Sequence, residues 1–111
     1  MNWKEFVDES GLEAIKKLSV EKPQVIFKHS TRCSISSMAK SRLERSIEPD
    51  GIDFNYLDLI ANRSISNKIA TDFDVEHASP QILIIKNGEC VYDESHSAIN
   101  MAEIMEVVGT R

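Results

Sequence analysis

The most constraining feature of the sequence is a helical run enclosed between two β-rich runs. The stretches "PQVIFKH" (23–29) and "IDFNYLDLI" (52–60) are rich in β-branched and aromatic residues. Between them, "SISSMAKSRLERSIE" (34–48) places apolar side chains at helical spacing and stops before the turn sequence "PDG". Two strands joined by a crossover helix pair in parallel within one sheet. The middle of the chain therefore predicts a β-α-β unit.

The C-terminal third adds an antiparallel hairpin to this unit. "QILIIK" (81–86) is typical of a buried strand, and "CVYD" (90–93) is the predicted returning strand. The dipeptide "NG" between them is the strongest short-range hairpin signal. The second half of the sheet is therefore expected to be antiparallel, which makes the sheet mixed.

Helices are predicted from about Gly11, over Ser64–Phe73 and from Asn100. The first of them is expected to start with a capping box, in which Ser10 and Glu13 satisfy free backbone N–H groups. Residues 3–7 fit either a weaker strand or the start of this helix. The predicted fold class is α/β, with a central mixed β-sheet flanked by helices.

Length and charge limit the classes of function. With 111 residues the chain is expected to form a single domain, residues 1–111. Its 13 basic and 18 acidic residues give a net charge of −5 without a basic stripe, which argues against a nucleic-acid partner. No run approaches the ~18 apolar residues of a membrane span, and no apolar signal segment is present, so we expect no membrane partner and a cytoplasmic location.

The two cysteines, Cys33 and Cys90, lie far apart in the sequence. There is no C-x-x-C motif, and no group of Cys and His residues has metal-ligand spacing. We therefore expect neither a structural disulfide nor a metal site, and no tightly bound cofactor.

Cys33 is the candidate nucleophile, because it lies where the strand ending near His29 gives way to the helix beginning near Ser34. Unpaired N–H groups and the helix dipole favour a negative charge there, and Arg32 adds a positive charge, so the thiolate is favoured over the thiol. The alternative is a small, inert core cysteine. The polar flanks of Cys33 argue against it, whereas Cys90, inside a predicted strand, fits a packing role.

Two further sequence features are candidate parts of a site around Cys33. Ser36 lies about one helical turn after Cys33, where its N–H or hydroxyl group could reach the sulfur but could not form a disulfide. Ser79-Pro80 directly precedes the strand 81–86, a position where proline is ordinary, and the dipeptide alone predicts a trans bond. A cis bond would instead present the Ser79 backbone to an extended thiol peptide.

Together, the motifs resemble a known family. The phrases "FKHSTRCSIS", "SNKIATDFDVEHASPQILIIKNGE" and "SHSAI" resemble the YtxJ-like bacilliredoxins, monothiol proteins of the bacillithiol redox system with a thioredoxin-like three-layer fold. The resemblance covers about residues 23–104. It implies a nucleophilic Cys33, a cis Ser79-Pro80 bond and removal of bacillithiol from protein mixed disulfides. The chain departs from the family motif at Ser34, where proline is common and would fix φ at the first helical position.

The candidate site residues fall into three groups. Cys33 is the catalytic candidate, and a second group lies beside it or in the Ser-Pro segment as candidate substrate-binding residues: Arg32, Ser34, Ser36, Ser79 and Pro80. The second tier of candidates is His29, Thr31, His77 and His96. The three histidines share the family phrases and fit hydrogen-bonded structural roles better than catalytic ones.

The absence of a second cysteine near Cys33 indicates the reaction type. A lone thiolate can take a small thiol from a mixed disulfide but needs an external thiol to release it. The predicted partners are S-thiolated client proteins, with bacillithiol or a similar small thiol as co-substrate. Two alternatives remain at this point: a glutathione-type monothiol glutaredoxin, which could bind an iron-sulfur cluster through Cys33 of two chains, and a catalytically silent adaptor that presents the Ser79-Pro80 groove.

Overall fold

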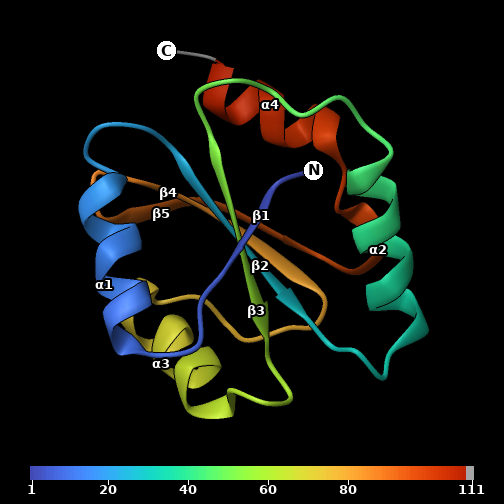
Figure 1. The fold of residues 1–111 in the computed structure, drawn as a ribbon, viewed down its shortest axis with the longest axis horizontal. Helices are drawn as coiled ribbons and strands as arrows, with labels where there is room; N and C mark the ends of the chain where they lie inside the picture. Colours follow the sequence, from blue (N-terminus) through green and yellow to red (C-terminus); the bar gives the residue numbers. More distant parts are fainter. Residues whose placement is uncertain (110–111) are drawn as a thin grey trace.

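The computed structural model describes residues 1–109 as one mixed sheet with helices on both faces (Figure 1). The elements in chain order are β1 (Trp3–Glu5), α1 (Glu9–Leu18), β2 (Gln24–His29), α2 (Ser34–Glu44), β3 (Asp53–Asp58), α3 (Arg63–Phe73), β4 (Gln81–Lys86), β5 (Glu89–Ser95), the 3-10 helix η1 (His96–Ala98) and α4 (Met101–Gly109).

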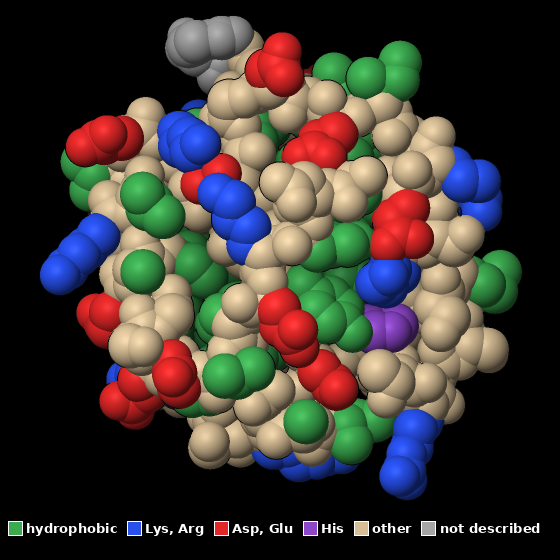
Figure 2. Space-filling view, in the orientation of Figure 1, with side chains coloured by type: hydrophobic (Ala, Val, Ile, Leu, Met, Phe, Trp, Pro, Cys, Tyr) green, Lys and Arg blue, Asp and Glu red, His purple; other side chains and the backbone are tan. Residues whose placement is uncertain are grey.

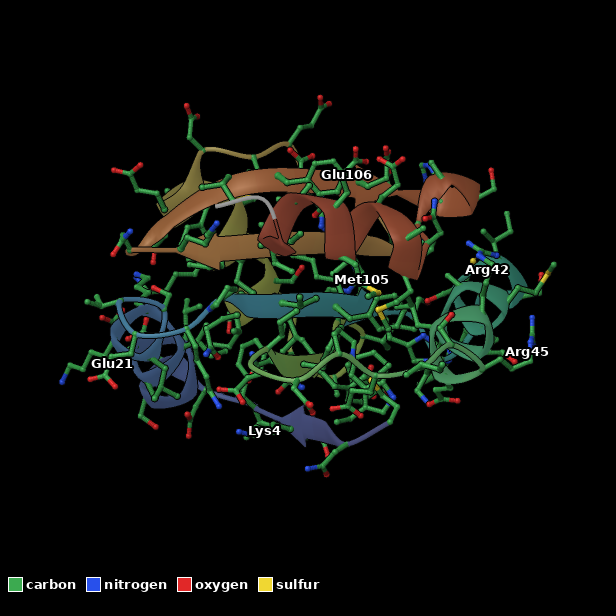
Figure 3. The ribbon with its side chains drawn as sticks, turned by 90° about the horizontal axis from the view of Figure 1, so that it is seen from above. Lys4, Glu21, Arg42, Arg45, Met105 and Glu106 are labelled. Carbon is green, nitrogen blue, oxygen red and sulfur yellow. The ribbon has the colours of Figure 1, made fainter. Side chains whose placement is uncertain are left out.

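The five strands lie in the order β1-β3-β2-β4-β5, which Figure 3 shows one above another. β1, β3 and β2 are parallel, whereas β4 runs antiparallel to both β2 and β5. The predicted β-α-β unit, hairpin and α/β fold class are therefore confirmed. Asn87 and Gly88 both have positive φ angles, 53° and 77°, as the tight hairpin turn requires. Trp3–Glu5 pairs with β3, which settles the open alternative for residues 3–7 in favour of a strand.

Alternate residues of the central strands fill two hydrophobic clusters, one on each face of the sheet. Phe27 of β2 packs with Ala39 and Leu43 of α2 on the face covered by α2 and α4. Its neighbour Ile26 packs with residues of α1 and α3, such as Leu12, on the other face. Figure 1 shows these helix pairs on opposite sides of the strands. A residue of β2 therefore faces α2 when its number is odd and α1 and α3 when it is even.

The start of α1 differs from the prediction. Asp8 is the N-cap, and its carboxylate accepts hydrogen bonds from the Gly11 N–H (3.0 Å) and from Ser10 Oγ (2.7 Å). The capping box of Ser10 and Glu13 is therefore wrong, because Ser10 lies inside the helix as a partner of the cap. A Cβ atom at Gly11 would lie 2.7 Å from Phe6 Cβ, so this close approach of the first turn to Phe6 requires glycine.

Helix α2 is shorter than predicted and buries a different face. It ends at Glu44 rather than at residue 48, and Ser36, Ala39 and Leu43 point into the core. Three of the apolar residues that lie at helical spacing in this run are exposed: Ile35 (49%), Met38 (63%) and Ile47 (88%). In its N-terminal half the helix faces the sheet with the small side chains of Ser36 and Ala39, which lets its first turn lie close to β2. At α4, the expected start is confirmed, because Asn100 Oδ1 accepts from the Glu103 N–H (2.9 Å).

Charged side chains of both signs are interspersed on the face of the molecule seen in Figure 2. Within residues 1–109, no helix combines the length and the apolar character needed to cross a membrane.

Candidate functional site around Cys33

The sheet topology brings three connecting segments to one edge. Lys28 at the end of β2 pairs with Gln81 at the start of β4, and Gln81 pairs with Ser95 at the end of β5. The turn before α2 (residues 30–33), the α3–β4 loop (residues 74–80) and η1 must therefore meet there. Figure 1 shows the first two segments together at the lower right of the sheet. Cys33 and Ser79-Pro80 thus belong to the same edge of the sheet, as a site made by both segments requires.

Cys33 is the N-cap residue of α2. Its backbone is extended (φ −113°, ψ 121°), its N–H donates to Ser30 O (3.2 Å), and its side chain makes no capping hydrogen bond. The thiol is half-buried, and the first turn of α2 holds no acidic residue. The first N–H groups of an α-helix have no partner within the helix, and those of α2 lie at this end. Thr31, Arg32 and Ser34 beside it are exposed.

Ser36, in contrast, is fully buried beneath the first turn of α2. Its hydroxyl accepts a hydrogen bond from the Ser30 N–H (3.0 Å) and lies 2.7 Å from His29 Nδ1. Because the hydroxyl still has its own proton, it can donate that proton to Nδ1 of a neutral imidazole. The Ser36 hydroxyl thus links the helix start to the end of β2. The sequence had suggested the sulfur of Cys33 as its partner.

His29 belongs to an aromatic cluster on the α2 face. Its ring stacks on Phe27 (5.7 Å between centroids) and is tilted against Tyr56 (5.6 Å). Burial and the positive charge of Lys40 lower the pKa of His29, so the imidazole is neutral near pH 7. Lys40 Nζ lies over the Tyr56 ring (5.8 Å) and over the Trp3 ring (6.0 Å). The ring contacts with Phe27 and Tyr56 and the hydrogen bond with Ser36 hold His29 in a fixed orientation below residues 30–33, the turn that carries Cys33.

The Ser79-Pro80 segment lies at the same end of the sheet, directly before β4. Its peptide bond is cis, as the family resemblance implied and contrary to the trans bond that the dipeptide alone predicted. Pro80 is buried, and its carbonyl accepts a hydrogen bond from the His96 N–H (3.0 Å). His96 has a positive φ of 59° at the turn into η1. The Pro80–His96 bond fastens the loop to the end of β5.

Arg42 joins α2 to the segment after η1. This side chain, labelled on α2 in Figure 3, donates from Nε (2.9 Å) and Nη2 (2.8 Å) to Ile99 O. Since η1 holds Pro80 through His96, the helix that carries Cys33 and the loop that carries Pro80 are connected through protein hydrogen bonds. Nothing in the sequence alone predicts this connection, because Arg42 is one of several basic residues on a polar helix face.

His77 lies on the opposite face of the sheet from His29. Its Nδ1 is 3.3 Å from Nζ of Lys28, which also donates to Ser66 O of α3 (3.0 Å). The fold thus brings all three histidines to the Cys33 edge, with His29 on the α2 face, His96 in the 3-10 helix η1 that contacts α2, and His77 on the other face. Sequence reasoning missed Lys28, although a lysine within a strand of buried residues was the available signal.

Cys90 lies at the far end of the sheet, next to the hairpin turn. Its Sγ is 3.3 Å from Tyr92 O, and burial raises the pKa of its thiol. Both cysteines are free thiols. Among the residues that the structure describes, no group of three His, Cys, Asp or Glu side chains is placed to hold a metal ion.

Comparisons with known proteins agree with this architecture. Residues 4–104 match the family described as "Monothiol bacilliredoxin BrxC". A solved structure described as a candidate oxidoreductase with a thioredoxin fold is 27% identical, with a TM-score of 0.82 over 94% of this chain and 91% of that one. Thioredoxin from Fasciola hepatica (18% identical, TM-score 0.76, 96% of each chain) and thioredoxin F from spinach chloroplast (16%, 0.71, 96% and 90%) share the fold.

Proposed function

The chain belongs to the monothiol bacilliredoxin BrxC family, and from that premise we propose that it is a thiol-disulfide oxidoreductase that removes bacillithiol from protein mixed disulfides through Cys33. One observation carries the proposal. Cys33 occupies the N-cap position of α2 with a partly exposed thiol, and the position one turn further along is a buried serine. The arrangement provides a nucleophile without an internal second thiol.

In the first step, the Cys33 thiolate attacks the bacillithiol sulfur of the client's mixed disulfide. A bond forms between Cys33 Sγ and that sulfur, the client–bacillithiol disulfide breaks, and the client leaves as a thiolate that takes up a proton from water. The helix N-terminus stabilises the attacking thiolate. Exposed Thr31, Arg32 and Ser34 line the approach to the sulfur, where the guanidinium can bind anionic groups of the small thiol.

In the second step, a free bacillithiol thiolate attacks the bacillithiol sulfur bound to Cys33. Bacillithiol disulfide forms and the Cys33 thiolate is regenerated, so the chain needs no cysteine of its own for release. The oxidised small thiol must then be reduced by another enzyme. Ser79 and Pro80 are proposed to hold the extended client chain during the first step, through the backbone groups that flank the cis bond.

His29 and Ser36 are proposed to position the turn of residues 30–33, which carries Cys33. The Ser36 hydroxyl bonds both His29 and the Ser30 N–H, and the Ser30 carbonyl in turn accepts from the Cys33 N–H. This chain of hydrogen bonds fixes the backbone of residues 30–33 relative to β2. Because His29 is neutral, the contact adds no charge beneath the thiolate.

The substrate assignment is tested with one client protein that has a single reactive cysteine. The client is blocked either with bacillithiol or with glutathione, and each form is incubated with the protein and the matching free thiol. We expect the bacillithiol adduct to be released at least ~10-fold faster, equivalent to ~1.4 kcal/mol of transition-state stabilisation.

The two alternatives give different outcomes in the same assay. Equal or faster release of glutathione would assign the chain to glutaredoxin-type chemistry. No release of either thiol by a folded protein would indicate an adaptor without catalytic activity.

A further inference from the structure

Lys28 occupies a position that lysine rarely takes. It lies near the end of β2, the central strand of the sheet, its exposure is 0%, and it is among the largest fully buried side chains of the protein. Its even number places it on the face covered by α1 and α3, away from His29. The Lys28 ammonium is therefore buried on the face of the sheet opposite the turn of residues 30–33, which carries Cys33.

No carboxylate pairs with this ammonium in residues 1–109. Its partners are the carbonyl of Ser66 (3.0 Å) and Nδ1 of His77 (3.3 Å). Burial lowers the pKa of Lys28 to about 8, so the group is still mostly charged at pH 7. His77 is an exposed residue, and its pKa is lowered by partial desolvation of the ring and by the positive charges of Lys28 and Arg63. At pH 7 a mostly charged Lys28 therefore donates to the neutral imidazole of His77.

A second polar side chain holds the same loop from the neighbouring strand. Gln81 pairs directly with Lys28 across β2 and β4 and lies on the same face of the sheet. Its Nε2 donates to Glu76 O (2.9 Å). Lys28 and Gln81 therefore hold two consecutive residues of the α3–β4 loop, Glu76 by its backbone and His77 by its side chain, just before Ser79-Pro80.

In the described part of the chain, two buried polar atoms, one at the end of the loop and one at the start of β4, have no hydrogen-bond partner to support the loop conformation. Within residues 1–109, Ser79 Oγ and Gln81 Oε1 are buried without a hydrogen-bond partner. Burying an unpaired polar atom disfavours the conformation that buries it. Without the hydrogen bonds of Lys28 and Gln81, the loop would be free to relax toward states in which these atoms reach water.

From these contacts we infer that Lys28 is a positioning residue for thiol exchange, whose buried ammonium fixes the α3–β4 loop and so holds Ser79-Pro80 in place beside Cys33. The inference rests on the proposed function, in which that segment binds the client chain. Lys28 does not touch the reacting sulfur atoms, because it lies on the other face of the sheet. It acts through Ser66 and His77.

As a positioning residue, Lys28 should be needed for the release of bacillithiol but not for the stability of the fold. A lysine whose pKa is lowered on folding disfavours the folded state at every pH below that lowered value, because the charged form is better solvated in the unfolded chain. Replacing such a lysine by an apolar residue of similar length is commonly neutral or stabilising. A purely structural lysine would instead be needed for stability.

The first test is Lys28→Met, with Lys17→Met on the exposed side of α1 as the matched control. For Lys28→Met we expect a Tm equal to or above that of the wild type, at least ~10-fold slower release of bacillithiol from a blocked client, and less than ~2-fold change in alkylation of Cys33 by iodoacetamide. Iodoacetamide is a small reagent, and it does not have to be held by the α3–β4 loop to react with Cys33. Lys17→Met should match the wild type in all three measurements.

The second test measures the opening of the α3–β4 loop directly, without an activity assay. Amide hydrogen exchange of residues 76–79 should be at least ~10-fold faster in Lys28→Met, with the amides of α2 unchanged. His77→Ala should reproduce the effect. His77→Asn, whose side-chain oxygen can accept in place of Nδ1, should stay within ~3-fold of the wild type.

The failure of this inference is distinguishable from failure of the proposed function. A wild-type protein that releases no bacillithiol refutes the proposed function. Unchanged loop exchange or undiminished release in Lys28→Met refutes the positioning role. A large drop in Tm, or slower alkylation of Cys33 in parallel with slower release, would also overturn it, because Lys28 would then support the fold or the thiol rather than the loop.

Discussion

Cys33→Ser is expected to lower the release of bacillithiol from a blocked client at least ~1,000-fold, equivalent to ~4 kcal/mol in the activation free energy. The thiolate is the species that attacks a disulfide, and a serine hydroxyl is not ionised near neutral pH. The half-buried position of Cys33 at the start of α2 tolerates an oxygen, so the fold should be unchanged. The measurement is the release rate at fixed client concentration, with circular dichroism as a check of folding.

Cys90→Ser is the matched control for this experiment. Cys90 lies at the hairpin end of the sheet, and burial raises the pKa of its thiol, so it should contribute neither to release nor to fast alkylation near pH 7. Release by Cys90→Ser should therefore equal that of the wild type. If Cys33→Ser retained activity and Cys90→Ser lost it, the reactive thiol would have been assigned to the wrong residue.

Ser36→Cys should change the reaction from a one-thiol to a two-thiol mechanism. A thiolate at position 36 can attack Cys33 Sγ in the mixed disulfide, so that the small thiol leaves and an internal disulfide forms. Positions 33 and 36 are the N-cap and the third residue of α2, one turn apart, a separation compatible with disulfide geometry. We expect the fraction of protein that retains the bacillithiol adduct after oxidation to fall at least ~10-fold.

Ser36→Ala is the control that distinguishes the effect of the new thiol from the effect of losing the hydroxyl group. Both variants remove the hydrogen bonds to His29 and to the Ser30 N–H, but only Ser36→Cys adds a sulfur. The alanine variant should keep the stable adduct. An adduct yield in Ser36→Cys as high as in Ser36→Ala would mean that side chain 36 cannot reach Cys33 Sγ.

Local sequence patterns were sufficient to predict the sheet and most of the helices. The β-α-β unit followed from a helical period between two β-rich runs, and the hairpin from Asn87-Gly88, whose φ angles are both positive. The start of α1 was misplaced because Asp8 and Ser10 are both good N-cap residues, and sequence does not say which of them caps the helix. The close contact between Gly11 and Phe6 is a tertiary feature.

The candidate site was less predictable, because its contacts join distant parts of the chain. The position of Cys33 was evident from the change of pattern at the end of β2. Its surroundings were not: Ser36 bonds His29 because α2 buries small residues and exposes Met38, contrary to the apolar pattern. Lys28 finds its partner His77 in a loop far along the sequence, and no local signal connects the two.

The most direct test of the central claim is the intact mass of the protein after incubation with a bacillithiol-blocked client in the absence of free thiol. The account predicts one bacillithiol per protein molecule, bound to the peptide that contains Cys33, removed by a reducing agent and absent from Cys33→Ser. Transfer of bacillithiol to Cys90, or a client that loses its bacillithiol while Cys33 stays unmodified throughout, would contradict it.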